Sequence, residues 1–122
     1  MADISAAVTA GAGNIDVLAL RTSSNISPTN GSTLIRINNG GLIINGATAP
    51  TISAAVQFGD SLVLKEALVY VRDGQTGTSA LTGGVIASDF TKFGPGLLEI
   101  GGTSNILAAS NSRLPIVSVQ EG

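Results

Sequence analysis

The chain has 122 residues, of which 43% are hydrophobic and 11% charged, and its formal net charge at pH 7 is −2. It contains no cysteine and no histidine, which excludes disulfides, thiolate metal sites and the commonest general base and transition-metal ligand. Because no cluster of basic residues is present and no window is apolar enough for a membrane-spanning helix, we expect neither nucleic acid as a partner nor a transmembrane helix. A single domain over residues 1–122 is the expectation for this length.

The N-terminal half alternates between short apolar runs and turn signals. After residues 1–14, "MADISAAVTAGAGN", the first strand-like run covers 15–21, and the polar segment 23–32 with Pro28 is predicted to be a surface loop. In 32–46, period-two alternation predicts an inward face on both sides of the Asn-Gly-Gly bend. The inward residues predicted there are Ile35, Ile37, Leu42 and Ile44, with Arg36 outward.

Residues 51–73 contain the longest alternation in the sequence. The pattern predicts an inward face made of Ile52, Ala54, Val56 and Phe58, continued after a turn at Asp60 by Leu62 and Leu64. Phe58-Gly59-Asp60 and Asp73-Gly74 are turn signals. The core is therefore expected to consist mainly of aliphatic side chains, since the four aromatic residues are Phe58, Tyr70, Phe90 and Phe93.

The C-terminal part carries a Gly94-Pro95-Gly96 turn between the runs 83–93 and 96–102. A phosphate-binding glycine loop leads into a helix, whereas "GPGLLEI" leads into a strand, so we predict a structural bend. Leu98 and Ile100 are expected to face inward, with Lys92 and Glu99 outward as a solvated pair. The tail 106–122 departs from this pattern, and Pro115 predicts an edge or capping strand there.

Helical periodicity is nearly absent, which predicts an all-β protein. Short strands with two inward residues, glycine-containing bends and few aromatic residues favour a single-stranded parallel β-helix (β-solenoid) of about four to six coils. An antiparallel β-sandwich is the alternative, because Asn-Gly and Asp-Gly pairs also suit hairpins. Residues 1–14 and 106–122 are then expected to be capping or subunit-exchanging segments, since solenoid ends expose apolar surface.

Residues 90–105, "FTKFGPGLLEIGGTSN", resemble the autotransporter-associated β-strand repeat. The positions that match its pattern are Thr91, Lys92, Gly94, Gly96, Leu98, Ile100, Gly102 and Asn105. Residues 17–27 and 32–59 are similar to preceding rungs of such proteins. The resemblance implies a right-handed parallel β-helix in the passenger part of a secreted or surface-displayed bacterial protein.

The sequence offers weak candidates for chemistry. Asp60, Asp73, Asp89 and Glu99 were weighed as catalytic carboxylates of a polysaccharide-active enzyme, and Asp60 or Asp73 as calcium ligands, but aspartate is also a common turn former. We therefore predict no catalytic, cofactor-binding or metal-binding residue and no enzymatic activity. A glycan-binding face would depend on Tyr70 and Phe93.

These observations predict a structural, non-catalytic β-helical module of a bacterial cell-surface or extracellular stalk, with self-assembly into filaments as a further expectation. Its expected partners are further copies of the chain, through end-to-end or strand-exchange contacts. The alternatives are a carbohydrate-binding adhesive module that meets a surface glycan, and a polysaccharide-active β-helix enzyme.

Overall fold

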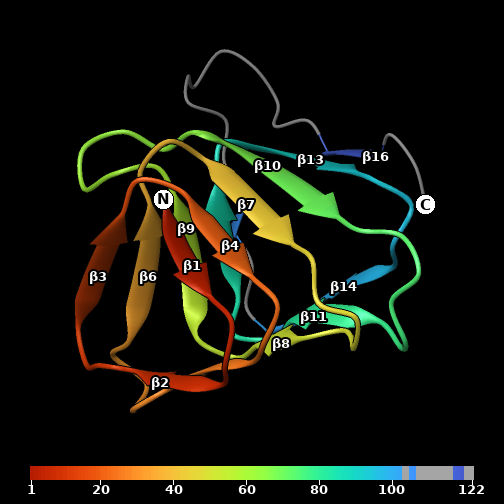
Figure 1. The fold of residues 1–122 in the computed structure, drawn as a ribbon. Helices are drawn as coiled ribbons and strands as arrows, with labels where there is room; N and C mark the ends of the chain where they lie inside the picture. The colour runs from red at the N-terminus through yellow and green to blue at the C-terminus, as the bar shows by residue number, and fades with distance from the viewer. Residues whose placement is uncertain (103–104, 107–116, 120–122) are drawn as a thin grey trace.

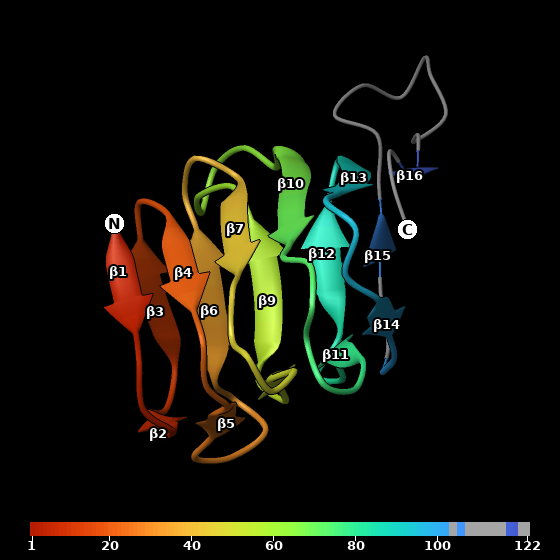
Figure 2. The ribbon, with the colours of Figure 1, turned by 45° about the vertical axis from the view of Figure 1, so that its right-hand side comes forward.

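Each turn of the chain consists of three short strands joined by corners, and successive turns stack on one another (Figures 1 and 2). The computed structural model describes residues 1–102, 105–106 and 117–119. Over this part of the chain the fold is a β-solenoid of about five turns. The described residues form no helix, and so no helix that could span a membrane. The predicted parallel β-helix is confirmed, and the antiparallel sandwich is wrong.

All pairings between the strands of the three sheets are parallel. Sheet A contains, in spatial order, β1 (Ala2–Ile4), β4 (Leu20–Thr22), β7 (Gly41–Ile44), β10 (Glu66–Val71), β13 (Asp89–Phe93) and β16 (Val117–Val119). Sheet B contains β2 (Val8–Ala10), β5 (Ile26–Pro28), β8 (Thr51–Ile52), β11 (Ser79–Leu81) and β14 (Leu98–Ile100). Sheet C contains β3 (Asn14–Val17), β6 (Leu34–Ile37), β9 (Ala55–Phe58), β12 (Val85–Ala87) and β15 (Asn105–Ile106).

We number the coils by their strands, so that coil 1 is β1–β3, coil 2 is β4–β6, and coil 5 is β13–β15. Viewed from the N-terminal end, the strands of a coil follow one another clockwise while the chain moves away from the viewer, which makes the solenoid right-handed (Figures 1 and 2). Leu20 pairs with Ala2, Leu42 with Leu20, and Val69 with Leu42, so these coils advance by 18, 22 and 27 residues. The repeat length varies because the corners differ in length.

Inward side chains of the same kind lie above one another along the stack. In sheet C, Ile15 pairs with Ile35, Ile35 with Val56, and Val56 with Val85. The predicted inward faces of 32–46 and 51–58 are confirmed, since all of their apolar members are at most 4% exposed. Burial of such side chains contributes roughly 1.5–3 kcal/mol each, so this dry aliphatic column is the main stabilising feature of the fold.

The segments 1–14 and 23–32 hold more strand than the sequence predicted. Residues 1–14 supply β1 and β2, the first strands of sheets A and B. The loop predicted for 23–32 is wrong, because it contains β5, which ends at Pro28. Thr29 donates its backbone N–H to Ala10 O in β2, whereas Ile26 O accepts the backbone N–H of Ser53, which follows β8. Because backbone groups alternate in direction along a strand, the Pro28 nitrogen points to the same side as Ile26 O. It lies beyond the residues of β5 that pair with β8, so the proline removes no ladder bond.

The inward continuation predicted at Leu62 is wrong, since this side chain is 89% exposed, and Leu64 is half-buried rather than buried. Gly59 has a φ of 115° and ends β9, so the chain leaves sheet C there. Residues 60–64, which we call the tip loop, project from the corner before β10 begins at Glu66.

The outward position predicted for Lys92 is also wrong. Phe90 faces inward beside Ala67, and alternation along β13 then places Lys92 inward beside Val69, where it is 5% exposed. The Gly-Pro-Gly bend interrupts the alternation, so inward positions cannot be counted back across it from Leu98. Leu98 itself packs against the core, whereas Ile100 remains 38% exposed.

Val117–Val119 pair in parallel with Phe90–Lys92, so this part of the tail adds a strand to sheet A. The prediction made for Pro115 lies outside the described residues. Capping or exchange between subunits by 1–14 and 106–122 stays a prediction.

Candidate functional sites

The four carboxylates considered for chemistry are distributed over separate elements. Asp60 lies in the tip loop, Asp73 in the turn after β10, Asp89 at the start of β13 and Glu99 in β14. Among the residues that the structure describes, no three Asp, Glu, His or Cys side chains gather as a metal-binding group. Within the described part of the chain, none of these four carboxylates therefore belongs to a three-residue group that could hold a calcium ion.

Asp60 organises its own loop. Its Oδ1 accepts the backbone N–H groups of Leu62 at 2.8 Å and Val63 at 2.9 Å. These two bonds lower the pKa of Asp60 below its usual value, because they stabilise the ionised carboxylate. Gln57 donates from Nε2 to Asp60 O at 2.8 Å, and the backbone of Gly59 and Leu64 forms an antiparallel bridge. The carboxylate thus acts as a turn former that fixes the tip loop.

Lys92 and the Gly-Pro-Gly bend form one structural corner. Lys92 Nζ donates to Gly94 O at 2.5 Å, inside the coil. Gly94 has a φ of 85°, and a Cβ at this position would lie 2.4 Å from Val71 O in coil 4, the preceding coil. The structural bend is confirmed. The predicted surface pair of Lys92 and Glu99 is wrong, because Lys92 faces the column whereas Glu99 is exposed to solvent.

Two ion pairs join coil 1 to coil 2 on the outer surface. Arg21 donates to Asp3 across sheet A, and Arg36 contacts Asp16 across sheet C through two bonds of 2.7 and 2.8 Å. These hydrogen bonds lower the pKa of both aspartates. Both pairs involve register neighbours, so they are contacts between rungs rather than elements of a reaction site.

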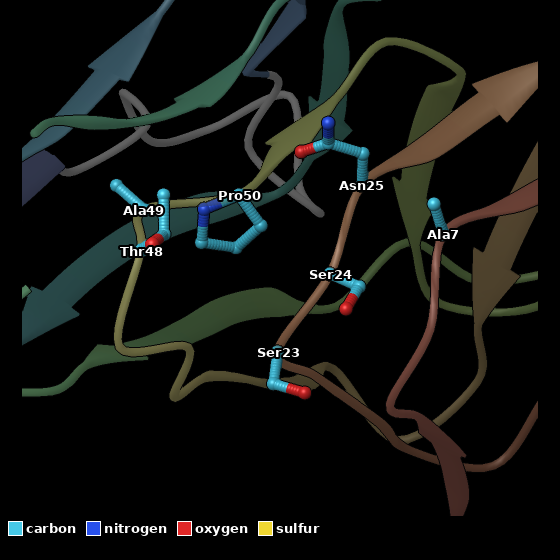
Figure 3. A pocket seen from close by; sticks show the side chains of 7 residues that line it. All are labelled: Ala7, Ser23, Ser24, Asn25, Thr48, Ala49 and Pro50. Atoms are coloured by element: carbon cyan, nitrogen blue, oxygen red, sulfur yellow. The ribbon is translucent and has the colours of Figure 1, made fainter. Parts of the chain in front are cut away.

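A polar hollow of about 250 Å³ lies at the corner between sheets A and B. Figure 3 shows Ser23, Ser24 and Asn25 along one segment, with the segment of Thr48 to Pro50 on one side and Ala7 on the other. Asn25 Oδ1 accepts the Thr51 N–H at 2.8 Å and so ties two coils together. The lining offers hydroxyl and amide groups but no titratable side chain, so this hollow has hydrogen-bonding groups for a neutral polar ligand and no general acid or base.

The outer face of sheet A carries an apolar groove of about 240 Å³. We call it the sheet A groove and define it by the outward residues Met1, Ala19, Gly41, Ile43, Leu68 and Phe93. Gly41 and Ala19 create the hollow because they leave space between larger neighbours. In Figure 1 this face is formed by β1, β4, β7 and β10, which lie side by side.

Tyr70 and Phe93 are neighbours in the same outward row of sheet A. Their ring centroids lie 5.4 Å apart and the ring planes are inclined by 57°, so the rings pack in a tilted pair rather than forming one flat platform. Phe93 is 39% exposed and Tyr70 half-buried. The two residues considered for glycan contact therefore do come together, at the border of an apolar groove.

Sequence reasoning missed this groove. Its residues come from β7, β10 and β13 and from the positions directly before β1 and β4, so they can be recognised as neighbours only when the register between coils is known. A local signal was present in Gly41 followed by Leu42 and Ile43, where a small outward residue precedes a large one. Comparisons with protein-family models, curated proteins and solved structures found no match to this chain.

Proposed function

We propose that the chain is a structural, non-catalytic β-helical module that serves as a rigid spacer or assembly unit. The observation that carries this proposal is the continuous column of inward apolar side chains, in which each rung packs on the next through all three sheets. Parallel rungs are spaced about 4.8 Å apart, so five coils form a stiff element of roughly 24 Å. A spacer needs length and stiffness, and this architecture supplies both.

A place at a bacterial cell surface, in a stalk of autotransporter type, is part of the same proposal. It is supported by the resemblance of residues 90–105 to the repeat of such proteins, together with the solenoid fold. The low charge and the hydroxyl- and amide-rich composition suit a solvated exterior. Surface labelling of intact cells that express the complete gene product tests this location, and label found only after lysis would contradict it.

Stiffness is testable by pulsed electron paramagnetic resonance. The chain has no cysteine, so Thr9→Cys/Thr82→Cys places one nitroxide pair on the outer face of sheet B, three rungs apart. We expect a single narrow distance distribution, with about 14 Å between the two backbone positions along the stack. A broad distribution would contradict the spacer role.

The non-catalytic part of the proposal has its own test. Purified protein is incubated with a panel of polysaccharides, with and without calcium, and reducing ends are measured. We expect no release above background, since Asp60 fixes a turn and Asp16 is held in an ion pair with Arg36. Cleavage that Asp60→Asn or Glu99→Gln abolishes would overturn this assignment.

Self-association is the assembly part of the proposal. Solenoids bury their apolar faces by stacking, and the inward residues of coil 1 are half-exposed, as at Ile4 and Val17. We expect oligomers that grow with concentration. Sedimentation and electron microscopy of the purified chain measure this, and monomers at every concentration and salt would contradict it.

Glycan binding is the second candidate, favoured by the outward pair of Tyr70 and Phe93. A sugar also requires hydrogen-bonding partners beside the ring, and the adjoining groove is almost wholly apolar. Retention on a glycan array that Tyr70→Ala removes would support this candidate, whereas absence of retention by the wild type would exclude it.

A further inference from the structure

Two apolar features of the outer surface complement each other. One is the sheet A groove, and the other is the tip loop, which exposes Leu62 by 89% and Val63 by 55%. Leu62 is the most exposed large hydrophobic side chain of the described residues. Exposed apolar surface of this kind, when it is rigid and localised, is typical of interaction sites.

We propose that the tip loop of one copy inserts Leu62 and Val63 into the sheet A groove of a second copy. This inference rests on the proposed self-association and names the surfaces that carry it. It also places the contact on the sides of the solenoid, whereas the sequence had predicted end-to-end or strand-exchange contacts.

The tip loop is formed before it docks. Asp60 binds the N–H groups of both Leu62 and Val63, Asp60 N donates to Val63 O at 3.1 Å, and Lys65 N donates to Phe58 O at 2.9 Å. A loop fixed by its own hydrogen bonds loses little conformational entropy on binding. The two apolar side chains are therefore presented in one arrangement.

The sizes of the two features agree. The groove of about 240 Å³ corresponds to roughly eight water volumes of about 30 Å³ each. The side chains of Leu62 and Val63 contain four and three carbon atoms, and this total of seven is close to the number of water volumes in the groove. Because Leu62 and Val63 are exposed, the tip loop does not fill the groove of its own chain and is available to the groove of a second copy.

The charges at the borders are also compatible. Asp60 begins the tip loop, and Lys65 follows directly after it. At the groove, Arg21 is the register neighbour of Ile43, and Glu66 precedes Leu68 by two residues on the same face of β10. A docked tip loop thus meets both signs of charge. Since tip and groove are different surfaces, the contact is heterologous. A pair of copies therefore keeps one free tip and one free groove, which leads to chains of copies unless a ring closes.

Two variants separate the halves of this contact. Leu62→Asp removes the apolar tip and leaves the groove intact. Gly41→Val fills the groove and leaves the tip intact, because Gly41 has no positive φ and an added Cβ would meet only Asn39 Oδ1, at 3.3 Å. A β-branched residue also suits a strand position. Leu18→Asp is the matched control, since Leu18 is 65% exposed and belongs to neither surface.

Sedimentation velocity of the full chain is the measurement, with circular dichroism to verify that each variant keeps its β structure. We expect the wild type and Leu18→Asp to associate with the same concentration dependence. Leu62→Asp and Gly41→Val should each need at least about tenfold more protein to associate, given the apolar burial lost. An equimolar mixture of these two variants should form a 1:1 heterodimer and nothing larger, because one intact tip and one intact groove remain.

The outcomes distinguish this inference from the broader proposal. If the wild type associates and both variants associate equally well, the inference is wrong and assembly through the coil ends stands. If the mixture stays monomeric although the wild type associates, the tip and groove are not partners. A wild type that is monomeric at all concentrations overturns both the tip–groove contact and the proposed self-association. If that monomer binds an apolar peptide and Gly41→Val abolishes the binding, the groove belongs to a different partner.

Discussion

Coil 3 and coil 1 have the same alternation of inward and outward residues, but they differ in how well the inward side chains are covered. In coil 3, Leu42 and Ile52 are 1% exposed and Val56 is fully buried. In coil 1, Ile4 and Val17 pack on the core but stay half-exposed, because the described chain covers them on one side only. An inward position in a solenoid is therefore buried by its two neighbouring rungs and not by its own strand.

The greatest change in stability is expected when two isoleucines of the same ladder in sheet C are replaced, one in coil 2 and one in coil 1. Ile35→Ala should lower the free energy of unfolding by about 2–5 kcal/mol, since Ile35 lies between Ile15 and Val56 and is 4% exposed. Ile15→Ala should lower it by less than half as much, because Ile15 is already partly in contact with solvent. Urea unfolding followed by circular dichroism measures both, and equal losses would refute the nearest-neighbour explanation.

The second prediction compares two glycine corners, one in coil 1 and one in coil 5. Gly94 and Gly13 both have positive φ, 85° and 81°. Gly13→Ala should cost only the left-handed strain of about 1–2 kcal/mol, as no atom lies within 4 Å of the added Cβ. Gly94→Ala should cost more, because its Cβ would lie 2.4 Å from Val71 O. Thermal and urea unfolding of the two variants give the ranking, and the reverse order would mean that the contact between coils relaxes freely.

The third prediction tests whether Lys92 in coil 5 is buried in the same way as the inward residues of coil 3. Lys92→Met should lower stability by about 1–3 kcal/mol, because Gly94 O loses its buried donor. Lys65→Met is the control on an exposed lysine, with an expected change within about 0.5 kcal/mol. A neutral Lys92→Met would place this lysine on the outside, as the sequence had predicted.

The smallest effect concerns the ion pairs that hold coil 1. The pKa of Asp16 is lowered in the folded protein by its bond to Arg36, so the ionised form favours folding. This contribution is present above the usual pKa of 3.8 and is lost as the pH falls through the lowered folded value. Urea midpoints should therefore decrease below about pH 4. Asp16→Asn or Arg36→Gln should make this decrease shallower, and an unchanged slope would show that the pair does not contribute.

Local alternation predicted most of the core correctly where a strand and its inward face are continuous, as in 32–46 and 51–58. It failed at Leu62, where Gly59 and the Asp60 carboxylate turn the chain out of the sheet, and at Lys92, where a bend separates the strand from the next run. The strand ending at Pro28 was missed because proline is a common loop signal, whereas here Pro28 lies beyond the residues of β5 that pair with β8 and interrupts no ladder bond.

The candidate surfaces were less accessible to sequence reasoning than the core. Tyr70 and Phe93 were singled out one by one, but their contact depends on the pairing of β10 with β13. The sheet A groove depends on Ala19, Gly41 and Leu68 standing in adjacent coils, 22 and 27 residues apart by the pairing of their strands. With repeat lengths that change from coil to coil, no fixed period in the sequence reveals these neighbours.

By itself, the sequence determined that this protein is an all-β chain of short strands with an aliphatic column and glycine corners, because alternation and turn chemistry act within a few residues. Only the packing of the coils reveals which strands stack, how far each inward side chain is covered, and that the protein carries both an apolar loop and an apolar groove. Inter-coil register is set by packing between residues 18–29 positions apart, and this packing leaves no local signature.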